Sequence, residues 1–294
     1  MEERSRRLRR LFALATPRRR DLAVAAVALA LLPTLVAVAA AQPVVVRQQS
    51  LTQRVDAQAF FVFDTSLSMS ARNGRDAPDR LARAVHEAER VIPTLGDIPV
   101  GIATMTDRVL PDLMPTTDDG LVLRTLQQSV GIDRPPPSQL YPTRATSLQA
   151  LFPLANGHLF APSVTHRILV VFTDGESSPL PVGVGYALAQ QVKTPPLFVH
   201  VWSKAEHIYV RGRVDRHYVP DPSSTRILTQ FAALTHGRVF GENDMRQLGQ
   251  TIHDRAGSTP AHTEVLGYAR IALAPWILLA GVIPLGFLLW RRNA

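Results

Sequence analysis

The stretch FFVFDTSLSMSA, residues Phe60–Ala71, joins a short apolar run directly to a carboxylate and a series of hydroxyl groups. The apolar run predicts a strand that is covered on both faces, as in a parallel sheet. Asp64, Ser66 and Ser68 then follow at every second position. Side chains at i, i+2 and i+4 of an extended chain point the same way, so these three groups are predicted to converge on one point.

Segments of alternating strand and helix character surround this stretch. Further strands are predicted at 100–104, 168–172 and 197–202, with apolar helical faces between them. The alternation predicts an α/β fold, a doubly wound and mostly parallel sheet flanked by helices. Such sheets bind ligands at the carboxyl ends of their strands, near a topological switch point. Asp64 and Asp174 each follow a predicted strand and therefore mark this edge.

Most of the positive charge lies at the two ends of the chain. The 294 residues carry a formal net charge of +8, but residues 1–21 contain eight arginines against three acidic residues, and Arg291 and Arg292 lie near the C-terminus. A nucleic-acid-binding face would place its excess charge in the folded domain, so no nucleic-acid partner is predicted. The pattern indicates membrane-topology charge instead. The chain has no cysteine, which excludes disulfides and thiolate metal sites.

Two uncharged apolar runs adjoin these basic ends. Leu22–Ala41 and Ile271–Trp290 are each about 20 residues long, enough to cross a hydrocarbon core of roughly 30 Å. The positive-inside rule predicts that both termini are cytoplasmic and that residues 42–265 lie outside. A cleaved signal peptide is the alternative for the first run, because the alanines at 39–41 suit a small-residue cleavage site.

The chain is accordingly divided into seven segments. They are a basic cytoplasmic tail (1–21), a transmembrane helix (22–41), a linker (42–57), a folded domain (58–256), a second linker (257–270), a second transmembrane helix (271–290) and a cytoplasmic tail (291–294).

The polar groups after the strands are hard oxygen ligands. Mg²⁺ takes oxygen ligands in near-octahedral geometry and readily keeps some of its water. Asp174, in the sequence FTDGES, supplies a second carboxylate, and Thr146 supplies a further hydroxyl after a proline-rich loop. Glu176 is predicted to be a solvated loop acid. His200, within an apolar strand, is predicted to be a core residue with its polar atoms satisfied.

These motifs resemble the von Willebrand factor A domain and its metal-ion-dependent adhesion site. The shared features are Asp-x-Ser-x-Ser at residues 64–68, a threonine loop and a later strand that ends in Thr-Asp-Gly at 173–175, and the resemblance runs from about residue 60 to 253. The family implies that the partner is a protein, whose acidic side chain takes the vacant coordination position. It implies Mg²⁺ or Mn²⁺ as the cofactor, with the ligands Asp64, Ser66, Ser68, Thr146 and Asp174.

The roles of these ligands also come from the resemblance. The hydroxyls of Ser66, Ser68 and Thr146 would contact the ion, and the two aspartates would hold it mostly through water. The family usually has Gly-Thr in the threonine loop, whereas this chain has Ala145-Thr146. Thr143, three residues earlier, is the alternative loop ligand.

A domain between two membrane spans resembles bacterial membrane proteins of the Bat aerotolerance type, which are often paired with MoxR-like ATPases. By this analogy the chain is a non-enzymatic, two-pass protein of the bacterial cell membrane that acts in the assembly or maturation of an envelope complex. The predicted orientation lets a cytoplasmic ATPase reach only the tails. The alternatives are a structural scaffold whose metal site is not essential, and a Mg²⁺-dependent phosphohydrolase. The motifs contain no lysine, arginine or histidine to stabilise a leaving group, which disfavours the phosphohydrolase.

Overall fold

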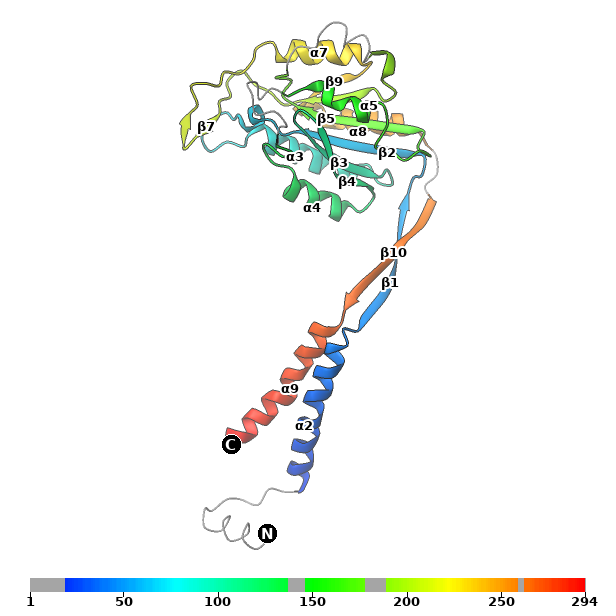
Figure 1. Ribbon diagram of the computed structural model, residues 1–294, viewed down its shortest axis with the longest axis vertical. Helices are drawn as coiled ribbons and strands as arrows, with labels where there is room; N and C mark the ends of the chain where they lie inside the picture. The colour runs from blue at the N-terminus through cyan, green and yellow to red at the C-terminus, as the bar shows by residue number, and fades with distance from the viewer. Residues whose placement is uncertain (1–18, 137–145, 178–188, 259–261, 294) are drawn as a thin grey trace. The chain divides into compact units, whose positions relative to one another are not determined.

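The computed structural model describes residues 19–136, 146–177, 189–258 and 262–293 (Figure 1). It divides into two compact units, the domain (Leu51–Glu264) and a terminal unit formed by Met1–Ser50 together with Val265–Ala294.

The domain is built on one six-stranded sheet with the order β4-β3-β2-β5-β6-β9. The strands are β2 (Ala57–Asp64), β3 (Val100–Met105), β4 (Val109–Thr116), β5 (His166–Thr173), β6 (Pro196–His200) and β9 (Arg238–Gly241). All are parallel except the edge strand β4, which is antiparallel to β3. The predicted doubly wound, mostly parallel sheet is therefore confirmed.

Helices cover both faces of this sheet (Figure 1). One core cluster lies under α3, α4 and α8, and a second lies under α5 and α7. The helices are α3 (Arg80–Val91), α4 (Asp119–Ser129), α5 (Phe152–Ala155), α7 (Ser224–Leu234) and α8 (Met245–Ala256). Short 3₁₀ turns are η1 (Leu67–Ser70), η2 (Ile92–Thr94), η3 (Leu148–Leu151) and η4 (Glu242–Asp244), and a small hairpin pairs β7 (Tyr209–Val210) with β8 (Arg213–Val214).

The central strand β2 supplies apolar side chains to both clusters. Phe61 and Phe63 belong to the first cluster, whereas Phe60 and Val62 belong to the second, as the period of two in a strand requires. Phe63 stacks on Phe172 of β5, with 4.9 Å between the ring centroids. A strand that is buried on both faces needs a continuous apolar run, and this explains the composition of the opening stretch.

The topology places the ends of β2 and β5 together at a switch point. From β2 the chain first adds β3 and β4 on one side, and it later adds β5, β6 and β9 on the other. Phe63 is in register with Phe172, so Asp64 and Thr173 end neighbouring strands. Ligand sites of doubly wound sheets form at this position.

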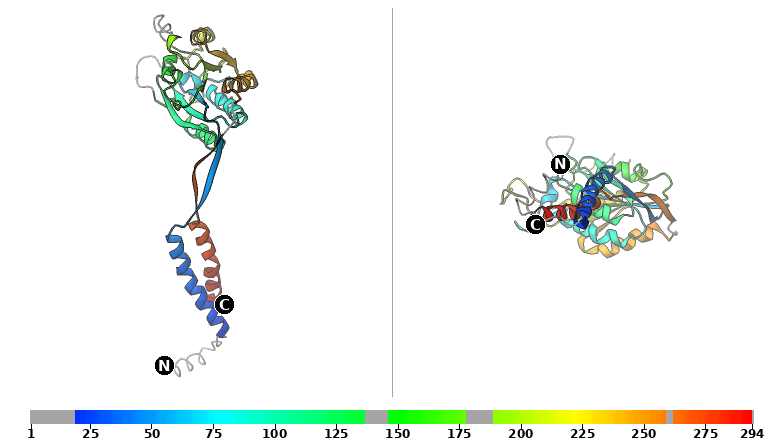
Figure 2. Two further views of the ribbon diagram at one scale, coloured as in Figure 1. Left: turned by 90° about the vertical axis from the view of Figure 1, so that its right-hand side faces the viewer. Right: turned by 90° about the horizontal axis from the view of Figure 1, so that it is seen from below.

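The terminal unit contains two apolar helices, α2 (Arg19–Ala40) and α9 (Ala274–Asn293). Both are long and apolar enough to cross a membrane. They lie side by side (Figures 1 and 2), and a Cβ placed on Gly281 would be 3.9 Å from Leu35 Cδ1. Large apolar side chains such as Trp276 and Ile283 are exposed on them, as expected of surfaces that face lipid.

A two-stranded ribbon adjoins these helices in the sequence. β1 (Val44–Gln53) pairs with β10 (His262–Ala272), and the Leu273 backbone N–H donates to the Pro43 carbonyl over 2.9 Å. The segments predicted as linkers, 42–57 and 257–270, thus contain paired strands. The second helix begins at Ala274, three residues after the predicted start of the span, because residues 271 and 272 still belong to β10.

Candidate metal site

The five predicted ligands come from three loops at the carboxyl edge of the sheet. Asp64 ends β2, and Ser66 and Ser68 lie in the turn that follows. Thr146 forms an isolated parallel bridge with Ser177, just beyond the Thr173–Gly175 turn. Thr143, the alternative loop ligand, lies outside the described residues.

The Asp64 carboxylate is the centre of the hydrogen bonds between these loops. Thr146 Oγ1 donates to both of its oxygens, over 3.0 and 3.1 Å. Thr173 Oγ1 donates to Oδ2 over 2.7 Å, and the Ser66 backbone N–H donates to Oδ1 over 3.0 Å. One side chain therefore joins the ends of β2 and β5 to the threonine loop.

The two serines converge, but by a different geometry from the one predicted. The chain does not stay extended after β2, because the 3₁₀ turn η1 begins at Leu67. The turn brings Ser66 Oγ within 3.0 Å of Ser68 Oγ. This distance is far shorter than the roughly 7 Å between the i and i+2 positions of a strand. The tight turn thus creates the hydroxyl pair.

The chemistry of this donor set fits a divalent cation. Asp64 is fully buried, and each of its hydrogen-bond donors within the described ranges is neutral. Burial, followed by the negative charge of Asp174, raises the pKa of the Asp64 carboxyl to about 7. A buried anion without a cationic neighbour is unfavourable. A divalent cation would compensate this charge and could take the hydroxyl oxygens as ligands.

Asp174, the fifth predicted ligand, has a cation beside it that sequence reasoning missed. Arg80, the first residue of α3, is fully buried, and its Nη1 lies 2.8 Å from Asp174 Oδ2. Its Nη1 also lies 2.9 Å from Glu176 Oε1, and its Nε lies 2.6 Å from Glu206 Oε2. Burial by itself would lower the pKa of Arg80, but Asp174 and the other acids raise it above the ordinary value. Arg80 therefore stays charged, and an ion that used Asp174 as a ligand would have to share this carboxylate with it.

Glu176 is a largely buried member of this cluster, with its side chain only 9% exposed, so the prediction of a solvated loop acid is wrong. Its carboxylate accepts hydrogen bonds from Trp202 Nε1 over 2.9 Å and from the Tyr218 hydroxyl over 2.9 and 3.0 Å. Burial raises its pKa above the usual range, and Asp174 adds to the effect. The carboxylate of Glu176 helps to compensate the positive charge of the buried Arg80 side chain.

The sequence did contain one signal for Arg80. It shares a helical face with Leu81, Ala84, Ala88 and Val91, all of which are buried. A charged residue on an apolar stripe must find a partner in the interior. Glu206, by contrast, lies in a polar loop, where no periodicity marks it as buried.

His200 is hydrogen-bonded as predicted, although it is half-buried at the end of β6 and does not lie fully in the core. Its Nε2 lies 3.0 Å from the Asp174 carbonyl oxygen, and burial lowers its pKa. A neutral imidazole that donates to this carbonyl supports the Asp174 loop from the neighbouring strand. Within the described ranges, histidine, aspartate and glutamate form no three-membered metal cluster, so the candidate site depends on its hydroxyl groups.

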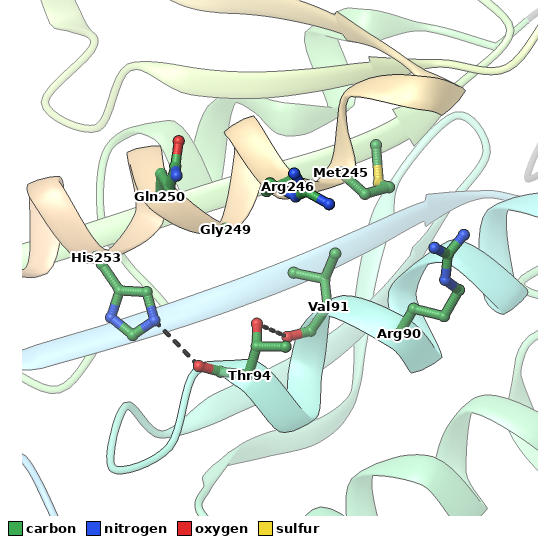
Figure 3. Close-up of a pocket in the computed structure, with 8 residues that line it drawn as sticks. All are labelled: Arg90, Val91, Thr94, Met245, Arg246, Gly249, Gln250 and His253. Atoms are coloured by element: carbon green, nitrogen blue, oxygen red, sulfur yellow. Dashed lines mark hydrogen bonds between the residues drawn. The ribbon is translucent and has the colours of Figure 1, made fainter.

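A separate pocket of about 380 Å³ lies between the end of α3 and α8 (Figure 3). It is lined by Arg90, Val91, Thr94, Met245, Arg246, Gly249, Gln250 and His253, and includes none of the predicted ligands. Two of its polar groups are already paired. Arg90 forms an ion pair with Glu87 over 3.1 Å, and His253 Nε2 lies 3.0 Å from the Thr94 carbonyl oxygen. This lining indicates a surface groove between helices.

Comparisons with known proteins agree with this fold. Residues 59–176 match the family model of the von Willebrand factor type A domain. The chain is similar to the conserved hypothetical protein BatB from Bacteroides thetaiotaomicron, with 21% identity and a TM-score of 0.53 over 69% of this chain and 100% of that chain. It is also similar to an aerotolerance-related membrane protein from Bacteroides fragilis, with 19% identity and a TM-score of 0.50 over 68% of this chain and 98% of that chain.

A weaker likeness is to proximal thread matrix protein 1 from the mussel byssus, a structure with a zinc-occupied adhesion-site motif. It has 14% identity and a TM-score of 0.42, over 70% of this chain and 49% of that chain. Among curated proteins, none matches the chain.

Proposed function

Since this chain carries a von Willebrand factor type A domain, we propose that it is a membrane-anchored binding module that uses a divalent cation to capture an acidic side chain of a protein partner. The residues that would hold Mg²⁺ or Mn²⁺ are Asp64, Ser66, Ser68, Thr146 and Asp174. When bound, the ion supplies positive charge and a coordination position for the partner's carboxylate.

One observation carries this proposal. The Asp64 carboxylate is fully buried at the switch point, and its described hydrogen-bond donors are all neutral. Elsewhere in the domain, buried carboxylates have cationic partners, as Asp174 and Glu206 do with Arg80. An acid kept in the interior without a cation is a common property of ion-binding and catalytic sites.

Binding is favoured over hydrolysis because the nearby cations are already occupied. Arg80 is held by three carboxylates, and Arg83 is paired with Glu206 and Glu242. The charge of both guanidinium groups is already compensated by carboxylates, whereas a phosphohydrolase requires a cation that stabilises the leaving group. The likeness to Bat-type proteins supports a role in the assembly or maturation of an envelope complex by analogy, and so too a link to a MoxR-like ATPase.

The metal site predicts a specific response to Mg²⁺. At a concentration about 100 times its dissociation constant, Mg²⁺ should stabilise the full chain in detergent by roughly 2.7 kcal/mol, measured as a shift in thermal unfolding. Asp64→Asn should remove this shift, because the charge that binds the ion is lost. Asp97→Asn, a carboxylate outside the site, is the matched control and should keep it. An equal shift in the Asp64→Asn variant would contradict the metal site.

Capture of a partner is tested separately by purification of the membrane protein with and without EDTA. A partner that is retained in buffer with Mg²⁺ and lost with EDTA or with Asp64→Asn is the expected result. A complex that survives both treatments would favour the structural scaffold.

The membrane orientation can be tested because the chain has no cysteine of its own. A single cysteine at Val219, which is 76% exposed, should react with a membrane-impermeant maleimide added outside intact spheroplasts. A cysteine at Asn293 should react only after lysis, because the positive-inside rule places it in the cytoplasm. The reverse pattern would place the domain in the cytoplasm.

A further inference from the structure

The loop between β6 and α7 carries a hairpin beside the candidate metal site. We call residues 204–219, with β7 and β8, the arm. One end is joined to the loop after the serine motif, because Arg72 and His207 exchange two backbone hydrogen bonds of 3.0 Å each. At the other end, the Tyr218 hydroxyl donates to Glu176, two residues after Asp174. The arm is thus held by loops that carry predicted ligands.

The tip of the arm presents an arginine from an unfavourable backbone conformation. Arg211 has φ +50° and Gly212 has φ +78°, so the two-residue turn has the left-handed backbone that usually selects Asn-Gly. Glycine is favoured at 212 because L side chains rarely adopt a φ of +78°, and a Cβ there would also lie 3.0 Å from Arg75 Nη2. At position 211 the sequence has a cation where the backbone favours asparagine. The tip therefore combines the exposed side chains of Arg211 and Arg75.

The charges of the arm are not compensated within the described part of the domain. The exposed Lys and Arg side chains of the arm form no ion pair in this part of the structure, and neither does Arg75. By contrast, Arg54, Arg80, Arg83 and Arg90 all have acidic partners. The exposed cations on and beside the arm are Arg75, Lys204, Arg211, Arg213 and Arg216. Asp215, the one exposed or half-buried acid of the arm, accepts hydrogen bonds from His217. The arm consequently presents an excess of positive charge on its exposed surface.

The same short segment also exposes apolar side chains. Val210, Val214 and Val219 are 54%, 45% and 76% exposed. Single exposed valines are ordinary, but three of them among four cations form a surface with both apolar and electrostatic character. A partner that covers the valines would remove apolar area from water, and its carboxylates would pair with the arginines.

We propose that the arm is a docking surface for an acidic segment of a partner protein that also carries apolar side chains. The proposal rests on the proposed function in one respect, since the metal site would bind one carboxylate of the same segment. The arm would bind the remaining carboxylates of this segment, so that one acidic stretch of the partner contacts both the metal site and the arm. The arm would also steer association, because rim charges act mainly on the association rate.

The test uses the full chain in nanodiscs of phosphatidylcholine with Mg²⁺. The probe is a short fluorescein-labelled peptide of alternating glutamate and leucine, and its binding is followed by anisotropy. The combined variant Arg211→Gln, Arg213→Gln, Arg216→Gln should weaken binding about tenfold and reduce its salt dependence. The control variant Arg124→Gln, Arg226→Gln, Arg246→Gln removes the same charge from exposed positions outside the arm, and it should bind like the unchanged chain. A peptide with glutamine in place of glutamate should bind weakly to all three proteins.

The outcomes separate this proposal from the metal site. Equal binding by the arm variant and the control variant would overturn the docking surface, whatever the effect of Mg²⁺. Weaker binding by the arm variant, with no effect of EDTA or of Asp64→Asn, would support the arm and contradict the metal-dependent function. If the arm variant loses only its attachment to phosphatidylserine vesicles and still binds the peptide, the arm contacts lipid and the proposal is wrong.

Discussion

Replacement of Arg80 by methionine is expected to lower the free energy of unfolding by roughly 3–5 kcal/mol, the usual range when one partner of a buried ion pair is removed. Arg80 is fully buried and contacts Asp174, Glu176 and Glu206 at 2.6–2.9 Å. Methionine would fill much of the same space but would leave Asp174 and Glu176 without a counter-ion. Urea denaturation of the full chain in detergent, followed by circular dichroism, measures the loss.

Two further variants make this result specific. Arg83→Met is the matched control, because Arg83 lies on the same helix and also contacts Glu206, but its side chain is 22% exposed. A loss of about 1 kcal/mol is expected there. Addition of Asp174→Asn to Arg80→Met should recover part of the loss, since one uncompensated charge disappears. Equal losses for Arg80→Met and Arg83→Met would show that the buried cluster contributes no more than a surface pair.

Replacement of Arg54 by methionine is expected to lower the free energy of unfolding by roughly 2–4 kcal/mol. Arg54 is only 4% exposed and is paired with Asp56 over 2.7 Å. Its guanidinium also donates to the Ala256 and Gly257 carbonyl oxygens, over 2.6 and 2.7 Å. These carbonyls end α8, so the cation satisfies terminal acceptors and complements the helix dipole.

The loss of Arg54 should destabilise the end of α8 in particular, in addition to the whole domain. Arg54 connects the first residues of the domain to the end of its last helix, so its loss should speed hydrogen exchange in the final turn of α8 before it affects β2. Arg54→Lys should give an intermediate loss, because an ammonium group cannot reproduce three directed contacts. Arg90→Met, which removes a 63% exposed partner of Glu87, serves as the control and should change stability by less than about 1 kcal/mol. Unchanged exchange in α8 of the Arg54→Met variant would contradict the role of this contact.

Much of the fold was predictable because its signals are local. The apolar run before Asp64 and the run before Asp174 each specify a buried strand by composition alone, and β2 and β5 match them. Their mostly parallel arrangement followed from general rules on strand-helix-strand units, whereas the order of the strands came only from the structure. The pairing of β1 with β10 was missed, because two segments more than 200 residues apart carry no local sign that they will meet.

In the candidate site, too, contacts between neighbouring residues were predictable and contacts between distant segments were not. Asp64, Ser66 and Ser68 lie within five residues of one another, so their proximity is a local property, although the 3₁₀ turn that joins the hydroxyls was not predicted. Thr146 hydrogen-bonds to Asp64 only because the chain returns to the switch point after 82 residues. The sequence could name this threonine through a family resemblance, but not through spacing.

By itself, then, the sequence determined the strands, the apolar helices and the local group of oxygen ligands, because periodicity and composition act over a few residues. Only the tertiary structure decided that Arg80 would share Asp174 and that Glu176 would be an interior anion. The partners of Arg80 in these contacts lie 94 and 96 positions away in the chain. A charge on an apolar helix face must be paired once it is buried, but the topology of the sheet selects which acids surround it.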